Sequence, residues 1–168
     1  MGGDHQTVEE GVTASGYPGL DSLREAHQEG LGEIAHLEEV AGSLLGESPG
    51  SMDRSLRFFY GELEQHFREE EQVLFPALAR RLGWEGMLRA MLDEHVAFWK
   101  AVEALEEAAQ EPQRTANIAR HIVWLLRSHI QKEEQMVLPL AEKMLSPGEL
   151  VELGKRGVVR LVRPNSTA

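Results

Sequence analysis

The sequence contains no cysteine among its 168 residues. Disulfides, thiolate zinc sites, iron–sulfur clusters held by cysteine and cysteine nucleophiles are therefore excluded. It also lacks the run of roughly 18 apolar residues that a transmembrane helix needs. The polar first residues contain no apolar stretch of the kind found in signal peptides. Any bound metal must use nitrogen and oxygen ligands, and the expected compartment is the cytoplasm.

Basic residues are scarce. Lysine and arginine number 17 against 28 acidic residues, which gives a formal net charge of −11 and a pI near 5.1. A nucleic-acid-binding protein usually presents a basic face, and nothing in this sequence suggests one. The electrostatic field attracts cations and repels phosphates. We expect neither nucleic acid nor a membrane as a partner.

Helical periodicity begins after Pro18 and continues to about Leu145. Glycine and proline interrupt this pattern at 46–50, at Gly83 and near Pro112, and such residues end helices. Four long helices are expected, over 19–45, 52–82, 84–110 and 113–145. Short connections favour antiparallel neighbours. The predicted fold is all-α, an up-down-up-down antiparallel four-helix bundle.

The two ends of the chain differ from this periodic part. Residues 1–18 are rich in Gly, Ser, Thr and Glu and are predicted to form a flexible arm, 19–145 the bundle, and 146–168 a short helix and tail. Ser146, Pro147 and Glu149 form the pattern of a capping box. A fifth helix is expected over about 147–155.

Each long helix carries an apolar seam at three- and four-residue steps. The predicted seam of the second helix is Leu56, Phe59, Leu63, His66, Glu70, Val73 and Ala77. That of the fourth is Ile118, Ile122, Leu125, His129, Glu133, Met136, Leu140 and Met144. Every helix has one histidine in its seam, and the second and fourth add a glutamate four residues later. The polar seam residues are His27, His66, Glu70, His95, His129 and Glu133.

These polar residues lie where the core should be, which indicates a bound cation. An unpaired carboxylate in an apolar interior costs several kcal/mol or more, and no lysine or arginine occupies a seam position. Glutamate four residues after histidine lies on the same helix face, one turn away. In an up-down-up-down bundle the six side chains also converge on one layer near mid-bundle. The sequence therefore predicts a metal site.

An internal repeat supports this interpretation. The residues His66, Glu70, Glu71, Gln72 and Pro76 recur 63 residues later as His129, Glu133, Glu134, Gln135 and Pro139. His27 and His95 match more loosely, at an offset of 68. The predicted site is thus pseudo-two-fold. Such symmetry suits two equivalent ions bridged by carboxylates.

Between about residues 20 and 145 the chain resembles the hemerythrin-like (HHE) cation-binding domain family. The resemblance is carried by His66-x3-Glu70-Glu71 with Leu74-Phe75-Pro76, by Glu94-His95, and by His129-x3-Glu133-Glu134 with Leu138-Pro139. It implies two iron ions with an oxo or hydroxo bridge and two bridging carboxylates. It also implies dioxygen, peroxide or nitric oxide as small-molecule partners.

The sequence departs from the oxygen-carrying hemerythrins in its ligand pattern. Those proteins have a fifth histidine one turn after the third-helix histidine, where this chain has Trp99. Their last carboxylate follows its histidine by five residues, a place held here by Glu134, but Glu133 continues the seam and is preferred. Open metal positions then favour small-molecule chemistry or sensing over reversible oxygen carriage. The di-iron proteins that repair iron–sulfur clusters are also similar, apart from an N-terminal cysteine-containing module.

Several alternatives stay open at this point. Nitrogen and oxygen ligands also suit manganese, zinc or cobalt. A buried hydrogen-bonded network of His and Glu without metal is the alternative that needs no ligand. The chain is either a redox-active protein, with peroxide-decomposing (catalase-like) or oxygen-activating chemistry, or an iron or oxygen sensor or iron-storage module without turnover. Glu62 is a weak candidate for a seventh ligand. Glu71 and Glu134 are expected beside the seam.

Overall fold

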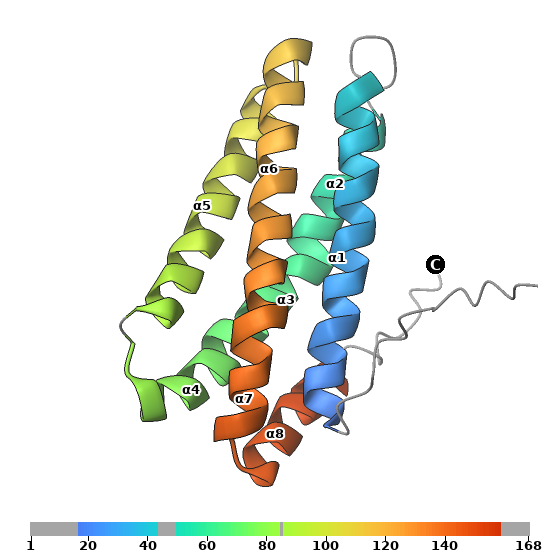
Figure 1. Ribbon diagram of the computed structural model, residues 1–168. Coiled ribbons are helices and arrows are strands. Elements are labelled where there is room, and N and C mark those ends of the chain that lie inside the picture. Colours follow the sequence, from blue (N-terminus) through green and yellow to red (C-terminus); the bar gives the residue numbers. More distant parts are fainter. Residues whose placement is uncertain (1–16, 44–49, 85, 159–168) are drawn as a thin grey trace, which may run out of the picture.

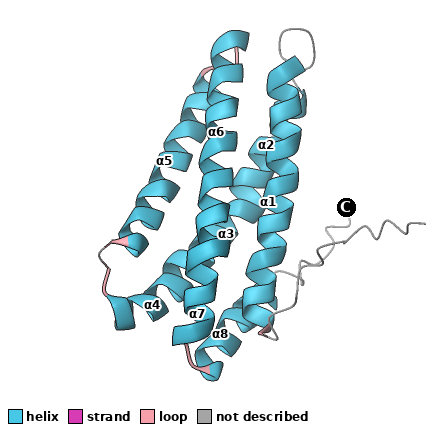
Figure 2. Cartoon of the chain, in the orientation of Figure 1, coloured by secondary structure: helices cyan, strands magenta, loops and turns pink. Residues whose placement is uncertain are grey.

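The computed structural model describes residues 17–43, 50–84 and 86–158, and all regular structure in these ranges is helical (Figure 2). The α-helices are α1 (Pro18–Ser43), α2 (Gly50–Phe58), α3 (Glu64–Glu69), α4 (Phe75–Leu82), α5 (Met87–Glu107), α6 (Pro112–Lys132), α7 (Leu138–Met144) and α8 (Pro147–Val158). Three π-helical turns continue them: η1 (Phe59–Leu63), η2 (Glu70–Leu74) and η3 (Glu133–Val137). Residues 50–82 and 112–144 thus form two long helices, each of which contains at least one π-helical turn.

These long helices lie alongside one another (Figure 1). Helix α1 packs against α6 and α8, and α5 packs against α6. The predicted arm, apart from Tyr17 and Pro18, and residues 44–45 of the first predicted helix lie outside the described residues. None of the described helices is both long and apolar enough to span a bilayer.

The third helix begins later than predicted, at Met87 rather than residue 84. Gly83 and Gly86 have φ angles of 78° and 65°. Side chains with a Cβ atom rarely adopt such angles, whereas glycine does so freely. The two glycines therefore extend the turn between α4 and α5.

Helix α8 begins with the capping box expected from the sequence. The hydroxyl and the backbone N–H of Ser146 donate to Oε2 of Glu149, at 2.8 Å and 2.9 Å. Arg81 also donates to Glu149, over 2.7 Å. These contacts hold the pKa of Glu149 below its usual value and tie α8 to α4.

The apolar core is divided into two clusters. One contains Ile34, Phe59, Phe98 and Leu126, and the other contains Leu20, Phe75, Leu88 and Val137, each with further aliphatic neighbours. Along every long helix, the buried histidine or glutamate falls between the stretches that supply the two clusters. The polar layer is consequently sealed by apolar side chains at both ends.

The π-helical turns shift the buried face of the helices that contain them. In η2 the N–H of Phe75 bonds to the carbonyl of Glu70, and in η3 the N–H of Leu138 bonds to that of Glu133. A proline follows directly in both cases. Proline lacks an N–H and its ring clashes with the carbonyl four residues earlier in an α-helix, so a wider turn relieves the crowding.

The predicted seam is wrong at Val73 and Met136, which lie inside these turns, whereas Ala77 beyond η2 is buried as predicted. Leu74 and Val137 are fully buried, whereas Val73 is only partly buried and Met136 is 50% exposed. A π turn contains about one residue more than an α turn, so the seam moves on by one position. The glutamates come before this shift, and their predicted inward direction is confirmed.

Candidate metal centre

The six polar seam residues meet in the layer between the apolar clusters. The structure buries all six to 3% exposure or less: His27, His66, Glu70, His95, His129 and Glu133. The first comes from α1, the second and third from α3 and η2, the fourth from α5, and the last two from α6 and η3. The imidazole nitrogens and carboxylate oxygens that could bind metal fall into two groups, each compact enough to surround one ion.

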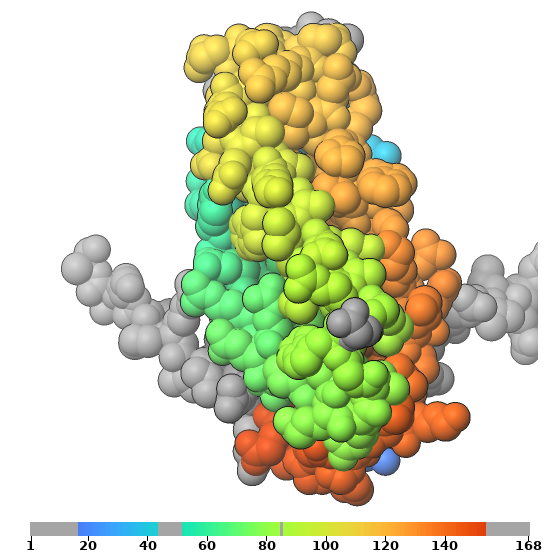
Figure 3. Space-filling model, turned by 90° about the vertical axis from the view of Figure 1, so that its left-hand side faces the viewer, coloured from blue at the N-terminus to red at the C-terminus, as the bar shows by residue number. Residues whose placement is uncertain are grey.

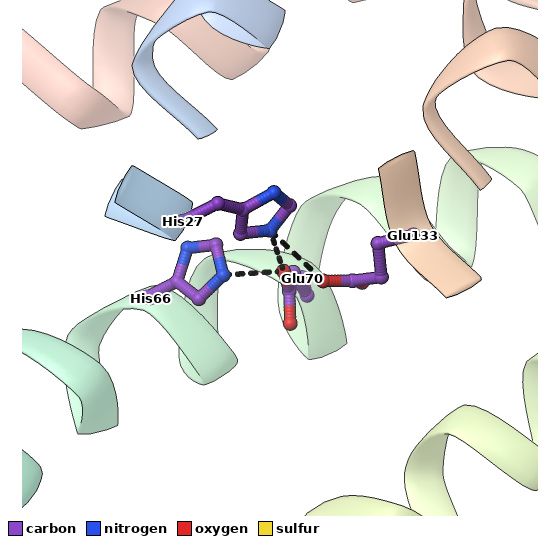
Figure 4. A group of neighbouring side chains, drawn as sticks. All are labelled: His27, His66, Glu70 and Glu133. Atoms are coloured by element: carbon purple, nitrogen blue, oxygen red, sulfur yellow. Dashed lines mark hydrogen bonds and ion pairs between the residues drawn. The ribbon is translucent and has the colours of Figure 1, made fainter. Parts of the chain in front are cut away.

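The first group combines His27, His66, Glu70 and Glu133, with ligand atoms all within 4.8 Å of one another. Figure 4 shows the two imidazoles and two carboxylates facing a common point. Nε2 of His27 lies 3.0 Å from Oε2 of Glu133, and Nε2 of His66 lies 2.8 Å from Oε1 of Glu70. Two nitrogen and two oxygen donors thus surround one position.

The second group combines Glu70, His95 and His129. Oε2 of Glu70 lies 3.2 Å from Nε2 of His95. Oε2 of Glu133 lies 3.4 Å from Nε2 of His129, so this carboxylate also borders both groups. Glu70 and Glu133 stand between the histidine pairs, where a carboxylate has to lie in order to bridge two ions.

Three of the four imidazoles contact an outer carboxylate through Nδ1. The distances are 2.6 Å from His27 to Glu134, 2.7 Å from His95 to Glu71, and 3.0 Å from His129 to Glu94. A carboxylate accepts a hydrogen bond, so Nδ1 carries the proton in each ring. Such an outer carboxylate orients a metal-binding imidazole and increases its basicity.

This proton arrangement turns the Nε2 lone pairs inward. Nε2 of His95 and Nε2 of His129 lie only 3.1 Å apart. Both Nδ1 atoms donate to carboxylates, so two lone pairs would face each other unless a positive charge lay between them. The donor set therefore fits a cation at this position.

The electrostatics of the metal-free side chains agree with this need for positive charge. Burial opposes protonation of His129, but Glu133, Glu70 and Glu94 outweigh it and raise its pKa to about 10. Burial also opposes protonation of His27. Contacts with Glu133, Glu134 and Glu70 nevertheless hold the pKa of His27 well above its usual value. Burial would raise the pKa of Glu70, yet the neighbouring histidines hold it well below the ordinary carboxyl range.

The remaining acidic candidates and the other described histidines lie outside both groups. Glu62 is exposed and takes no part in either group. Glu134, the alternative to Glu133, lies outside the layer and contacts Nδ1 of His27. His121 is exposed and stacks on Trp124, and His36 is half-buried on another face of α1.

Sequence reasoning missed two polar contacts. Glu94 was noted only as the neighbour of His95, although it bonds His129 and pairs with Lys132. Glu33, 5% exposed, accepts a hydrogen bond of 2.6 Å from the buried Ser55 hydroxyl. Glu33 lies six residues beyond His27, about 120° away around the helix, so the seam that contains His27 does not indicate it.

Comparison with known proteins agrees with the fold and the donor set. The model of the hemerythrin HHE cation binding domain matches residues 19–141. The chain belongs to this family, and the predicted resemblance is confirmed.

Among curated proteins the chain is similar to iron-sulfur cluster repair proteins named YtfE. The relative from Yersinia pseudotuberculosis serotype IB (strain PB1/+) is 28% identical over 137 residues, which is 73% of this chain and 62% of the relative. The relative from Yersinia pestis (strain Pestoides F) is 27% identical with the same coverage. The match thus spans 62% of the length of these relatives. No solved structure matches the chain.

Proposed function

We propose that this chain is a non-haem di-iron protein of hemerythrin-like, up-down-up-down topology with a short fifth helix. His27, His66, Glu70, His95, His129 and Glu133 are the proposed metal ligands. Iron bound there would supply the one- and two-electron chemistry of dioxygen, peroxide or nitric oxide. The convergence of four buried imidazoles and two buried carboxylates on two compact groups of ligand atoms supports the proposal most directly.

The protein's own contribution is binding, orientation and exclusion of water. Glu70 and Glu133 lie between the two histidine pairs and contact both. Hydrogen bonds to Glu71, Glu94 and Glu134 fix the orientations of the imidazole rings of His95, His129 and His27. The two apolar clusters keep bulk water from both ends of the layer. The four histidines and two glutamates supply about four donors to each ion, which leaves positions for a small molecule. Iron is favoured by family membership, and zinc or manganese would fit the same donors.

Metal analysis tests the proposal. Protein purified without chelator, or loaded with ferrous iron under anaerobic conditions, should contain about two irons per chain. Exposure to oxygen should then produce the absorption bands of an oxo-bridged diferric pair. Glu70→Gln should lose the bound iron and the absorption bands, because Glu70 belongs to both groups of ligand atoms. The matched control is Glu62→Gln, an exposed glutamate of the same long helix, which should retain both.

Reversible bleaching under vacuum would indicate a carrier, and gas evolution from peroxide would indicate a catalase-like enzyme. Iron binding without turnover would indicate the sensor or storage alternative. A chain that binds no metal in either preparation would contradict the proposal.

A second candidate function is repair of damaged iron–sulfur clusters, the activity in the names of the curated relatives. It is favoured by a match of 137 residues to those relatives. The test is reactivation of an oxidatively damaged iron–sulfur enzyme by the iron-loaded chain. Reactivation equal to that from free ferrous iron, or from the Glu70→Gln chain, would contradict it.

A further inference from the structure

A row of aromatic rings leads from the candidate metal centre to the protein surface. The ring of Phe67 stacks on His95, with centroids 3.8 Å apart and planes 9° from parallel. Trp99 contacts Phe67 edge to face at 6.1 Å. Tyr60 then stacks on Trp99 at 5.6 Å, with an interplanar angle of 18°. We call Tyr60, Trp99 and Phe67 the aromatic relay.

The outer end of the relay is accessible. Tyr60 is 45% exposed, and Tyr60, Phe67 and Trp99 all line an open pocket of about 380 Å³. The pocket lies where the helix 50–82 borders α5, and Figure 3 shows the face on which these two segments lie side by side. Small solutes can therefore reach a ring pair that is connected to a proposed metal ligand.

The chemistry of the two outer rings is specific. Indole and phenol are the aromatic side chains that lose an electron most readily, whereas the phenyl ring of Phe67 resists oxidation. Among the ring contacts of the described residues, Tyr60 and Trp99 are the only phenol and indole joined to the four histidines through successive rings. Packing alone would be served equally well by phenylalanine or leucine.

Tyr60 also has a partner that can take its proton. Its hydroxyl donates a hydrogen bond of 2.7 Å to Oε2 of Glu106, an exposed carboxylate. That hydrogen bond, with burial and nearby negative charge, raises the pKa of Tyr60 to about 12. The phenol is therefore protonated at neutral pH, and losing an electron requires losing the proton as well. Glu106 is placed to accept it and pass it to solvent.

We propose that the aromatic relay supplies single electrons to the metal centre, with Tyr60 as the surface electron donor. The inference rests on the proposed di-iron function. Reduction of hydrogen peroxide to two waters takes two electrons and two protons. When the centre holds only one reducing electron, Tyr60 gives the second through Trp99 and Phe67. Its phenolic proton passes to Glu106 and on to solvent, and the peroxide takes its two protons from solvent.

The resulting tyrosyl radical is then repaired from outside. A small donor of one electron and one proton, a hydroquinone or an ene-diol, returns both to Tyr60 at the pocket. The donor becomes a radical, and Tyr60 regains its hydroxyl hydrogen. The relay thus completes peroxide reduction without leaving an oxidising equivalent at the buried ligands.

The experiment uses the full chain with iron bound and the centre reduced by one electron. One equivalent of hydrogen peroxide is added, the sample is frozen, and electron paramagnetic resonance detects organic radicals. A tyrosyl signal is expected in the parent chain, and hydroquinone should remove it. Tyr60→Phe should lose the signal and Trp99→Phe should weaken it. Tyr17→Phe, which removes the only other tyrosine, and Trp124→Phe are the matched controls and should keep it.

Iron content, peroxide consumption and melting temperature are measured on the same samples. Iron bound and peroxide consumed with no radical, or with a radical undiminished in Tyr60→Phe, would overturn the relay alone. A chain that neither holds iron nor consumes peroxide would overturn the relay together with the proposed function. Tyr60→Phe keeps the ring and lies outside the metal layer, so it should melt like the parent.

Discussion

Oε2 of Glu94 lies 3.0 Å from Nδ1 of His129 and has no counterpart in the other half of the site. The repeat that relates His95 to His27 relates Glu94 to Ala26. Nδ1 of His66, the equivalent of Nδ1 of His129, is buried without a hydrogen-bond partner among the described residues. The pseudo-symmetry of the six inner residues therefore does not extend to the residues around them, and the two proposed ion positions have different surroundings.

Glu94→Ala should weaken metal binding at the position served by His129. Loss of a carboxylate that orients a metal-binding histidine typically costs about 10–100-fold in affinity. In an anaerobic titration with cobalt(II), one metal-binding step should be clearly weaker in Glu94→Ala than in the parent chain. The neighbouring, exposed Asp93→Ala is the control. Equal titrations for the two variants would show that Glu94 does not support the site.

Removal of metal should destabilise the fold. A metal that binds only the native state stabilises it by about 2.7 kcal/mol when its free concentration is 100 times Kd. Without metal, Glu70 and Glu133 stay buried, and only the raised pKa values of His27 and His129 provide positive charge beside them. We expect calorimetry to show a lower melting temperature after chelation and recovery on adding ferrous iron. Glu70→Gln should show no such recovery, and a metal-independent melting temperature of the parent chain would contradict the site.

Ser55→Ala should destabilise the protein without affecting the metal. The buried Ser55 hydroxyl donates to Oε1 of Glu33 across α2 and α1, and this oxygen would lose that partner while Oε2 keeps its ion pair with Arg54. An unsatisfied buried group costs about 1–3 kcal/mol. Urea denaturation measures the change, while metal content should stay at the parent value. Ser43→Ala, an exposed position of α1, should change stability by no more than about 0.5 kcal/mol.

Glu106→Gln should lower the pKa of Tyr60. The hydrogen bond to the Glu106 carboxylate is the largest cause of the rise to about 12, and an amide stabilises the protonated phenol less than a carboxylate does. The pKa of Tyr60 should return toward the ordinary phenol value of about 10. Phenolate absorbance in the Tyr17→Phe background follows Tyr60 alone. Glu107→Gln, an exposed neighbour, should leave the titration of Tyr60 as in the parent.

Much of this arrangement could be predicted from the sequence because the inner residues follow helical periodicity within the site itself, although the π turn η1 lies shortly before His66. His27, His66 and His95 lie in regular α-helix, and Glu70 and Glu133 are the first residues of their π turns. The four-residue spacing therefore holds from His66 to Glu70 and from His129 to Glu133. The seam is displaced before η1, where Ser55 rather than Leu56 is fully buried. The repeat gave independent support, since two copies of one pattern had to fold in the same way.

The rest could not be predicted because it depends on local backbone geometry and contacts between helices. The one-residue shift from Val73 to Leu74 follows from a π turn, which apolar periodicity does not reveal. A proline follows each glutamate by six residues, but proline also occurs at helix ends, so it does not by itself indicate a π turn. The contact between Glu94 and His129 joins α5 to α6, and no spacing within one helix indicates it.

The two apolar clusters also determine how a reactant can approach. Leucine and phenylalanine side chains block both directions along the long axis, so entry must be sideways, between neighbouring helices. Partly exposed carboxylates stand on those sides: Glu71, Glu94 and Glu134. Lys132 and Arg24 offset the charges of Glu94 and Glu134, so the surrounding apolar packing, rather than charge, limits what enters. Uncharged molecules of two or a few atoms can enter by this sideways route between helices. Dioxygen, nitric oxide and hydrogen peroxide are molecules of that size and charge.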